Sequence, residues 1–136
     1  MQEVSFVKGY QHDEKLRKSF NLLATLIFGI EFESWYQKGY WRDKYIPYSF
    51  VVQDQVVANV SVNLIDMTIN NSEKSAVQIG TVMTHPDHRG KGYSQLLMNK
   101  VLTDYANADL FYLFANETVL DFYPKFGFQR MAETSF

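Results

Sequence analysis

The sequence predicts a mixed α/β (α+β) fold in which helices flank a mostly antiparallel sheet. Three patterns lead to this fold class: helical spacing of apolar residues in the first third of the chain, strand-like alternation in the middle, and a strand–helix–strand pattern after it. The 136 residues, 46% of them hydrophobic, are enough to form the core of one ordinary domain. We therefore expect one domain over residues 1–136, with a helical segment at 1–45 and a meander at 46–84 before a β-α-β-α-β part at 85–136.

Apolar residues in the helical segment recur at two places with the spacing of a helix face. The first helix has Asp13 as its expected N-cap and Gly29 as its stop. Its apolar residues fall at i, i+4, i+7 and i+11 and are Leu16, Phe20, Leu23 and Ile27. A second, short helix that ends at Gly39 is expected where three aromatic residues share a face, namely Phe32, Trp35 and Tyr36.

The meander is predicted from runs that alternate between apolar and polar residues. One strand is expected at 49–53, and a half-buried strand is expected at 56–64, where valines alternate with asparagine and serine. Asp54-Gln55 would connect these two strands as a tight hairpin turn. The polar segment 66–75 is expected to be an exposed turn, and residues 76–84 form the next predicted strand.

The last part of the chain alternates between helix and strand patterns. A helix is expected at 93–106 and a strand covered on both faces at 110–115. A short helix from about Glu117, capped by Asn116, would end at Gly127, and a last strand would begin at Phe128. Only eight residues follow Phe128, which is room for one strand.

Composition and charge exclude several classes of protein. The chain has no cysteine, which excludes disulfides, cysteine-bound zinc and a thiol nucleophile and fits a reducing compartment. The net charge of −2 gives no general basic field for nucleic acid. No signal peptide is visible, and the most apolar stretch, 22–30, is far shorter than the ~20 residues of a membrane span. We expect a cytoplasmic protein that binds neither nucleic acid nor a membrane.

A candidate anion site lies where the strand 76–84 ends and the helix at 93 begins. The connecting turn contains two glycines, Gly90 and Gly92, and two cations, Arg89 and Lys91. A helix start leaves about four amide groups unpaired and carries partial positive charge, so this combination suits a phosphate or pyrophosphate. A solvated turn whose glycines only satisfy the backbone is the alternative. The spacing fits neither a Walker loop nor a dinucleotide fingerprint.

Two motifs in this part resemble those of the GNAT N-acetyltransferases. Arg89-x-x-Gly92-x-Ser94, after Val-x-x-His-Pro, resembles the family's acetyl-CoA loop, although Ser94 stands where the family has Gly or Ala. Residues 115–128, ANETVLDFYPKFGF, resemble its second acetyl-CoA motif. Together the motifs cover roughly 76–130. The run FYPKFGF and the start Thr-His-Pro are also similar to a branch of larger members, the enhanced-intracellular-survival-like acetyltransferases. The family usually ends with two strands, so we expect this chain to lack the last strand: the sheet is trimmed, a partner chain completes it, or the chain is the N-terminal part of a longer protein. An exposed final edge would favour a homodimer.

The resemblance implies a role for each matching position. The acetyl-CoA-binding residues would be those of the strand end and the loop, together with Asn116 on the pantetheine arm: Val82, Met83, Thr84, Arg89, Gly90, Lys91, Gly92, Tyr93 and Ser94. An amide at Met83 or Thr84 would polarise the thioester carbonyl. Tyr123 would contact the cofactor and, as the catalytic acid, protonate the leaving thiolate. Tyr123 as a core ring and Asn116 as a helix cap are the structural alternatives.

The sequence specifies the general base and the binding site of the acceptor amine less fully. The strand 76–84 contains no carboxylate, only Gln78, so the base candidates lie elsewhere or are ordered water: Glu31, Glu33, Asp66, His85 and Glu117. The acceptor amine is expected to bind at the segment 1–45, where aromatic residues occur together with carboxylates. These rings would form a wall that suits a cation, or they would simply pack the helices onto the sheet. The rings are Phe28, Phe32, Trp35, Tyr36, Tyr40 and Trp41, and the carboxylates are Glu31, Glu33 and Asp43. His85 and His88 have no evident third ligand, so no metal is expected.

The resemblance therefore implies an acetyl-CoA-dependent N-acetyltransferase that moves an acetyl group directly to a primary amine. The acceptor would be a small amine or a peptide amine, and acetyl-CoA would be a cosubstrate. The alternatives are a non-catalytic GNAT-like module that binds CoA as a sensor or interaction partner, and a phosphate-ligand binder outside this family.

Overall fold

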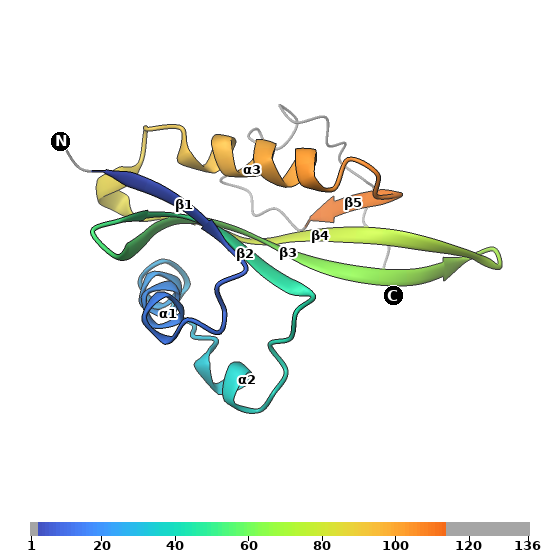
Figure 1. Cartoon of the computed structure of the whole chain (residues 1–136), viewed down its shortest axis with the longest axis horizontal. Coiled ribbons are helices and arrows are strands. Elements are labelled where there is room, and N and C mark those ends of the chain that lie inside the picture. The colour runs from blue at the N-terminus through green and yellow to red at the C-terminus, as the bar shows by residue number, and fades with distance from the viewer. Residues whose placement is uncertain (1–2, 114–136) are drawn as a thin grey trace.

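The chain folds into a sheet with helices on both faces (Figure 1). This computed structural model describes residues 3–113. The elements in chain order are β1 (Val4–Lys8), α1 (Glu14–Phe28), α2 (Glu33–Gln37), β2 (Tyr45–Val52), β3 (Gln55–Ile69), β4 (Ser72–Thr84), the 3-10 turn η1 (Pro86–His88), α3 (Tyr93–Asp104) and β5 (Leu110–Leu113). The predicted helix from Glu117, the last strand from Phe128 and the end of the strand 110–115 lie outside the described residues.

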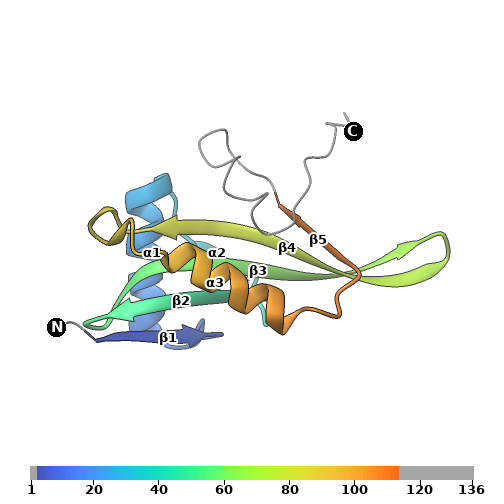
Figure 2. The same ribbon diagram turned by 90° about the horizontal axis from the view of Figure 1, so that it is seen from above.

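The sheet confirms the predicted fold class. Its described strands lie in the order β1-β2-β3-β4-β5; the first four are antiparallel to their neighbours, and β5 is parallel to β4. Helix α3 makes the crossover between β4 and β5 and lies over one face (Figure 2). Within the described residues, no helix is long and apolar enough to cross a membrane.

Strand β1 was not predicted from the sequence. The segment before Asp13 was assigned to a helical region, but Val4–Lys8 pairs with β2 along its whole length, from Val4 opposite Val52 to Lys8 opposite Tyr48. The strand lies at the sheet edge and most of it is exposed, so it lacks a clear alternation of buried and exposed residues. Its pairing is with residues 40 to 48 positions away, and no local pattern signals such a contact.

Both hairpin turns differ from the prediction. The first turn is Gln53-Asp54, one residue earlier than expected, because Gln55 pairs with Val52. The second is a two-residue turn at Asn70-Asn71, so the rest of the polar segment 66–75 belongs to β3 and β4 rather than to a loop. The four turn residues have φ between 51° and 67°, the left-handed conformation that tight hairpins require. Figure 2 shows this second hairpin projecting past the other strands.

From Val56 to Val62, strand β3 is buried on both faces rather than half-buried. Its apolar residues Val60 and Val62 face α3, where they pack with Leu97, Met98 and Val101. Its other face, covered by α1, carries Asn59 and Ser61, which are both 0% exposed. The core on this side consists mainly of Phe20, Leu23, Ala24, Trp41 and Met83. The predicted alternation of apolar and polar residues is present, but the polar side chains face the core between α1 and the sheet instead of solvent.

Helix α1 follows the predicted pattern, and α2 is attached to it by polar contacts. The Asp13 carboxylate caps α1 by accepting from the Leu16 amide (3.1 Å), and Gly29 ends it with a φ of 70°. The buried Arg17 guanidinium donates to the Glu33 carboxylate (2.8 Å) at the start of α2. This ion pair therefore fixes α2 against the first helix.

We expect the Glu33 ion pair to stabilise the fold in a pH-dependent way. The hydrogen bond from Arg17 lowers the pKa of Glu33, so the pair contributes fully above the ordinary glutamate pKa of about 4.3 and is lost as the pH falls through the lowered value. Glu33→Gln should reduce the free energy of unfolding by roughly 1 kcal/mol near neutral pH. Urea melts across the pH range measure this, with the exposed Glu73→Gln as control. If Glu33→Gln lowered the free energy of unfolding equally at pH 7 and pH 3, the ion pair would not be the source of this stability.

Candidate functional site

Strand β4 is irregular where it approaches the predicted anion site. Two of its residues, Thr81 and Val82, lie opposite a single residue of β3, Val60, which is a β-bulge. Thr81 has a φ of 49°, a rare conformation for a β-branched residue. On the other side, β5 pairs with β4 only over Ala76–Ile79. From Gly80 onward, no strand among the described residues pairs with that edge of β4.

The end of β4 offers backbone groups on this open edge. The His85 amide donates to the Val57 carbonyl on β3 (2.8 Å). Because amides point alternately to the two sides of a strand, the Thr84 amide points away from β3, and the Met83 amide points toward it. The Met83 side chain is buried in the α1-side core. Of the two amides predicted to polarise a carbonyl, only that of Thr84 faces the open edge.

The turn between β4 and α3 takes its shape from two glycines. It begins with η1, where the His85 ring accepts from the Asp87 amide (3.1 Å). Gly90 and Gly92 have φ of 79° and 76°, and Gly92 is the N-cap of α3. A Cβ at either glycine would meet no atom within 4 Å. The glycines are therefore needed for their left-handed backbone and not for lack of space.

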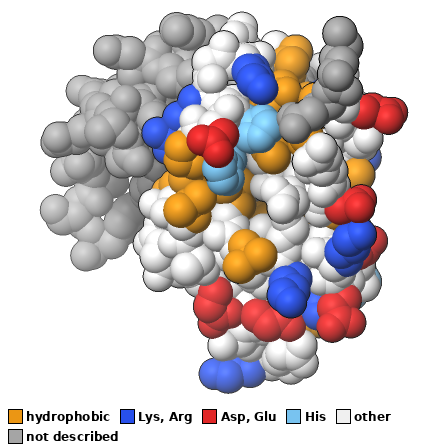
Figure 3. Space-filling view, turned by 90° about the vertical axis from the view of Figure 1, so that its left-hand side faces the viewer, with side chains coloured by type: hydrophobic (Ala, Val, Ile, Leu, Met, Phe, Trp, Pro, Cys, Tyr) orange, Lys and Arg blue, Asp and Glu red, His pale blue; other side chains and the backbone are white. Residues whose placement is uncertain are grey.

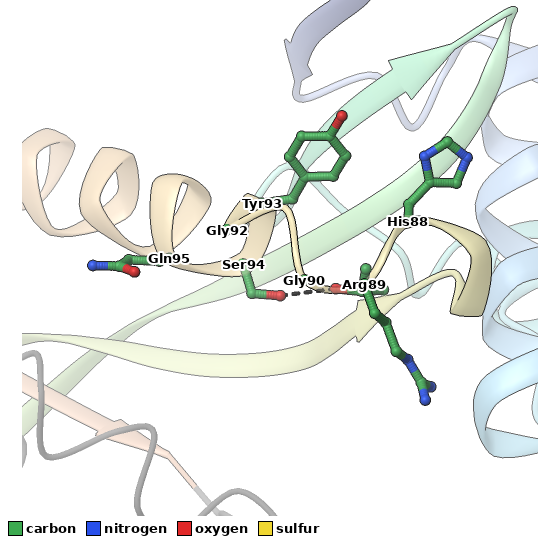
Figure 4. Close-up of a pocket in the computed structure, with 8 residues that line it drawn as sticks. His88, Arg89, Gly90, Gly92, Tyr93, Ser94 and Gln95 are labelled. Carbon is green, nitrogen blue, oxygen red and sulfur yellow. Dashed lines mark hydrogen bonds between the residues drawn. The ribbon is translucent and has the colours of Figure 1, made fainter.

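This turn and the start of α3 form a hollow of ≈ 200 Å³. Figure 4 shows the Ser94 hydroxyl pointing from the first turn of α3 toward β4, where it is hydrogen-bonded to the Thr84 hydroxyl (2.9 Å). No side chain caps the start of α3, so its first amides remain available. The hollow is lined by Thr84, His88, Arg89, Gly90, Gly92, Tyr93, Ser94 and Gln95. Six predicted residues are among these, whereas Val82, Met83 and Lys91 are not.

The charge around the hollow is positive. Arg89 and Lys91 are exposed, and the first turn of α3 carries no acidic residue. Burial lowers the pKa of His88, and the nearby Lys91 lowers it further, so its imidazole is neutral at neutral pH. Figure 3 shows histidine and basic side chains close together on this end of the molecule, with apolar side chains around them. The hollow therefore suits an anionic group.

The two histidines of the turn lie next to each other. The rings of His85 and His88 meet edge to face, with centroids 5.9 Å apart. Within residues 3–113, no group of three potential metal ligands occurs.

The described candidates for a general base all have other partners. Glu33 binds Arg17, and Glu31 accepts from the Ser34 amide (3.0 Å) at the start of α2. Asp66 binds Lys44 (3.0 Å) at the base of the long hairpin. The His85 ring caps η1, and Gln78 lies 3.5 Å from Asn63 across the sheet. Glu117, Asn116 and Tyr123 lie outside the described residues.

Most of the predicted aromatic wall packs the helices onto the sheet. Trp41 is buried, and Phe32, Trp35 and Tyr36 pack against the α1-side core. Phe28 and Tyr40 are the exceptions, being 43% and 59% exposed. Sequence reasoning missed a further ring, Tyr45 on β2, which packs edge to face on Trp35 and Trp41 and reaches Thr81 with its hydroxyl (2.5 Å). Its place at the start of a strand gave no signal of this contact.

Comparison with known families identifies the family of the chain. The sequence profile of the Acetyltransferase (GNAT) domain matches residues 10–131, so the chain belongs to the GNAT acetyltransferases. Membership of this family implies N-acetyltransferase activity. No protein among the curated sequences matches the chain.

Solved structures share the fold at low sequence identity. A predicted acetyltransferase from Clostridium acetobutylicum, solved with acetyl-CoA, has a TM-score of 0.77 at 19% identity, over 98% of this chain and 95% of that one. An acetyltransferase from Trypanosoma brucei has a TM-score of 0.76 at 19% identity, over 98% of each chain. A probable N-acyltransferase from Enterococcus faecalis has a TM-score of 0.77 at 21% identity, where the match covers 93% of this chain and 32% of that longer chain.

The torsion of Gly92 gives a test of the loop geometry. Gly92→Ala should lower the free energy of unfolding by about 1 kcal/mol, because alanine is strained at a φ of 76°. Gly92→Asn is the matched variant, since asparagine tolerates this conformation better, and it should cost less. Thermal or urea unfolding measures both, and an equal loss for the two variants would contradict a torsional role.

Proposed function

We propose that the protein transfers an acetyl group from acetyl-CoA directly to a primary amine. The observation that carries the proposal is the uncapped start of α3 beside the open edge of β4, with Thr84 and Ser94 bonded across the gap. The helix start suits the pyrophosphate of CoA, and the open strand edge suits its extended pantetheine arm. Both lie in a chain of the GNAT family.

The turn would hold the pyrophosphate. Backbone amides of residues 89–94 and the partial positive charge of the helix start favour an anion in the hollow. Arg89 and Lys91 add formal charge from its rim. The left-handed glycines keep these amides turned toward the same space.

The open edge of β4 would pair with the pantetheine arm as an added strand would. The direction of the strand supports Thr84, and not Met83, as the residue whose amide polarises the thioester carbonyl. The sequence alone did not decide between the Thr84 amide and the Met83 amide. Asn116 would contact the same arm, as the family resemblance implies.

The reaction needs two proton movements around the carbon–sulfur bond that breaks. The amine nitrogen attacks the carbonyl carbon, the tetrahedral oxyanion is held by the Thr84 amide, and the thiolate leaves. Tyr123 would protonate this thiolate, since a phenol and an alkyl thiol have similar pKa values. The amine loses its proton to water or to a base outside the described residues, because the described carboxylates proposed for this role are engaged elsewhere.

The acceptor would approach from the side of α1 and α2. Phe28 and Tyr40 are the exposed rings of this segment, and Asp43 is almost fully exposed. Exposed rings with a nearby carboxylate suit a cationic amine, either a small molecule or a peptide. The cytoplasmic location and the placement in the enhanced-intracellular-survival-like branch stay predictions.

A second function is favoured because the described carboxylates among the base candidates, Glu31, Glu33 and Asp66, all have other partners: a GNAT-like module that binds CoA without transferring acetyl groups. The two functions differ in turnover. Release of CoA thiol in the presence of a broad panel of amines supports the enzyme. Tight acetyl-CoA binding with no turnover over that panel supports the sensor.

We expect acetyl-CoA affinity to depend on the charges at the rim. Arg89→Ala with Lys91→Ala should raise Kd by roughly 10-fold or more and weaken its salt dependence, because two favourable charges are removed. Isothermal titration calorimetry measures Kd, and Lys74→Ala, which removes a positive charge from the long hairpin, is the control. Absence of acetyl-CoA binding by the wild-type protein at high micromolar concentration would refute the proposed function.

Tyr123→Phe tests the proposed acid. It should lower kcat by roughly 10²- to 10⁴-fold, the usual range for general acid catalysis, with a much smaller change in acetyl-CoA affinity. Steady-state kinetics and calorimetry on the same variant separate these effects. Unchanged turnover would remove Tyr123 from the mechanism.

A further inference from the structure

A chain of hydrogen-bonded polar side chains crosses the α1-covered face of the sheet and ends at the bulge in β4. It leads from Tyr10, before α1, to Ser49 on β2 and Asn59 on β3. Ser49 and Asn59 are both 0% exposed. Polar groups in such an interior are unfavourable unless each one is bonded, so the partners of each group show what the chain supports.

The direction of the hydrogen bonds can be followed from one end. The Ser49 hydroxyl donates its single proton to the Asn59 side-chain oxygen (2.7 Å). Tyr10 must therefore donate to Ser49 (2.6 Å). Burial raises the pKa of Tyr10, so its hydroxyl keeps that proton. With its oxygen satisfied on this side, Asn59 turns its NH₂ group toward β4.

The NH₂ group of Asn59 holds the bulge. It donates to the Thr81 carbonyl (2.8 Å) and to the Ser61 hydroxyl (2.8 Å). The carbonyl can only accept, so an ionised aspartate at position 59 could not make this bond. The Tyr45 hydroxyl binds the Thr81 hydroxyl at the same time (2.5 Å). Thr81 is thus held by both its backbone and its side chain.

Thr81 needs this support because of its backbone conformation. Its φ of 49° is unfavourable for a β-branched residue and persists only where neighbours impose it. Without the bulge, β4 would slip by one residue against β3, and each later residue would turn to the opposite side. The Thr84 amide would then face β3 instead of the open edge, and the Met83 side chain would leave the α1-side core.

We propose that Asn59 is a positioning residue for acetyl transfer. Its side-chain amide fixes the bulge at Thr81 and so directs the Thr84 amide toward the thioester carbonyl. Asn59 does not touch the substrate in this arrangement, because it lies within the core on the far side of β4's backbone from the hollow. The catalytic part of this inference rests on the proposed function, whereas the structural part does not.

The structural part is tested by amide hydrogen exchange of the full chain, measured by NMR at Met83 and His85, whose amides point toward β3. Asn59→Ala should speed exchange at these amides by roughly 10-fold or more relative to the rest of β4. Tyr10→Phe is the matched control: it removes a buried hydroxyl from the far end of the same chain but leaves the hydrogen bonds of Asn59 intact. Equal acceleration in both variants, or none in Asn59→Ala, would overturn the proposal.

A rescue experiment separates positioning from general destabilisation. Adding Thr81→Gly to Asn59→Ala removes the penalty for a positive φ, so it should restore part of the protection at Met83 and His85. No recovery would count against the proposed role. If Asn59→Ala does not fold, Tyr45→Phe removes only the hydroxyl that binds Thr81 and should give a smaller acceleration at the same amides; unchanged exchange there would overturn the clamp at Thr81.

Turnover then connects the bulge to catalysis. With acetyl-CoA and an accepted amine, Asn59→Ala should lower kcat by roughly 10- to 100-fold, the loss expected for a slightly misplaced donor, and Tyr10→Phe should remain within about 3-fold of the wild type. A wild-type protein without turnover would refute the proposed function, and the exchange experiment would still decide the structural role of Asn59. Altered exchange in Asn59→Ala with unchanged kcat would overturn its catalytic importance.

Discussion

The hydrogen bond from the Asn59 side chain to the Thr81 carbonyl is the contact on which the geometry of the site depends. It keeps two residues of β4 opposite one residue of β3, and this irregularity sets which backbone groups the last residues of the strand show to the open edge. The α1-side core depends on the same register, since Met83 is one of its members. Packing on one face and exposed amides at the edge are therefore two results of one local constraint.

The site combines this strand edge with the start of α3. The Thr84–Ser94 hydrogen bond joins the two elements, and the left-handed Gly92 turns the chain from one into the other. An extended ligand segment can pair along β4 while an anionic segment meets the helix start, without a break between the two sites. Over residues 3–113 the aromatic side chains serve mainly as packing, and Tyr45 reaches from that packing to the bulge.

Features set by local sequence were predicted well. Helix α1 begins after Asp13 and stops at Gly29 as its spacing indicated, and the glycine-rich turn lies at a helix start. Features set by distant contacts were not. Strand β1 is recognisable only from its pairing with β2, and the bulge occurs at a threonine inside an ordinary strand pattern. For the same reason the sequence did not distinguish Met83 from Thr84, because amide direction depends on the register with β3.

We propose that acetyl-CoA lies along the open edge of β4 and over the start of α3. Amide chemical shifts of the wild-type protein, followed by NMR during a titration with acetyl-CoA, test this most directly. We expect the largest changes within residues 3–113 at Thr84 and over 89–95. Changes concentrated at the separate hollow lined by Arg17, Asn21 and Glu33, or none at saturating acetyl-CoA, would contradict this binding mode.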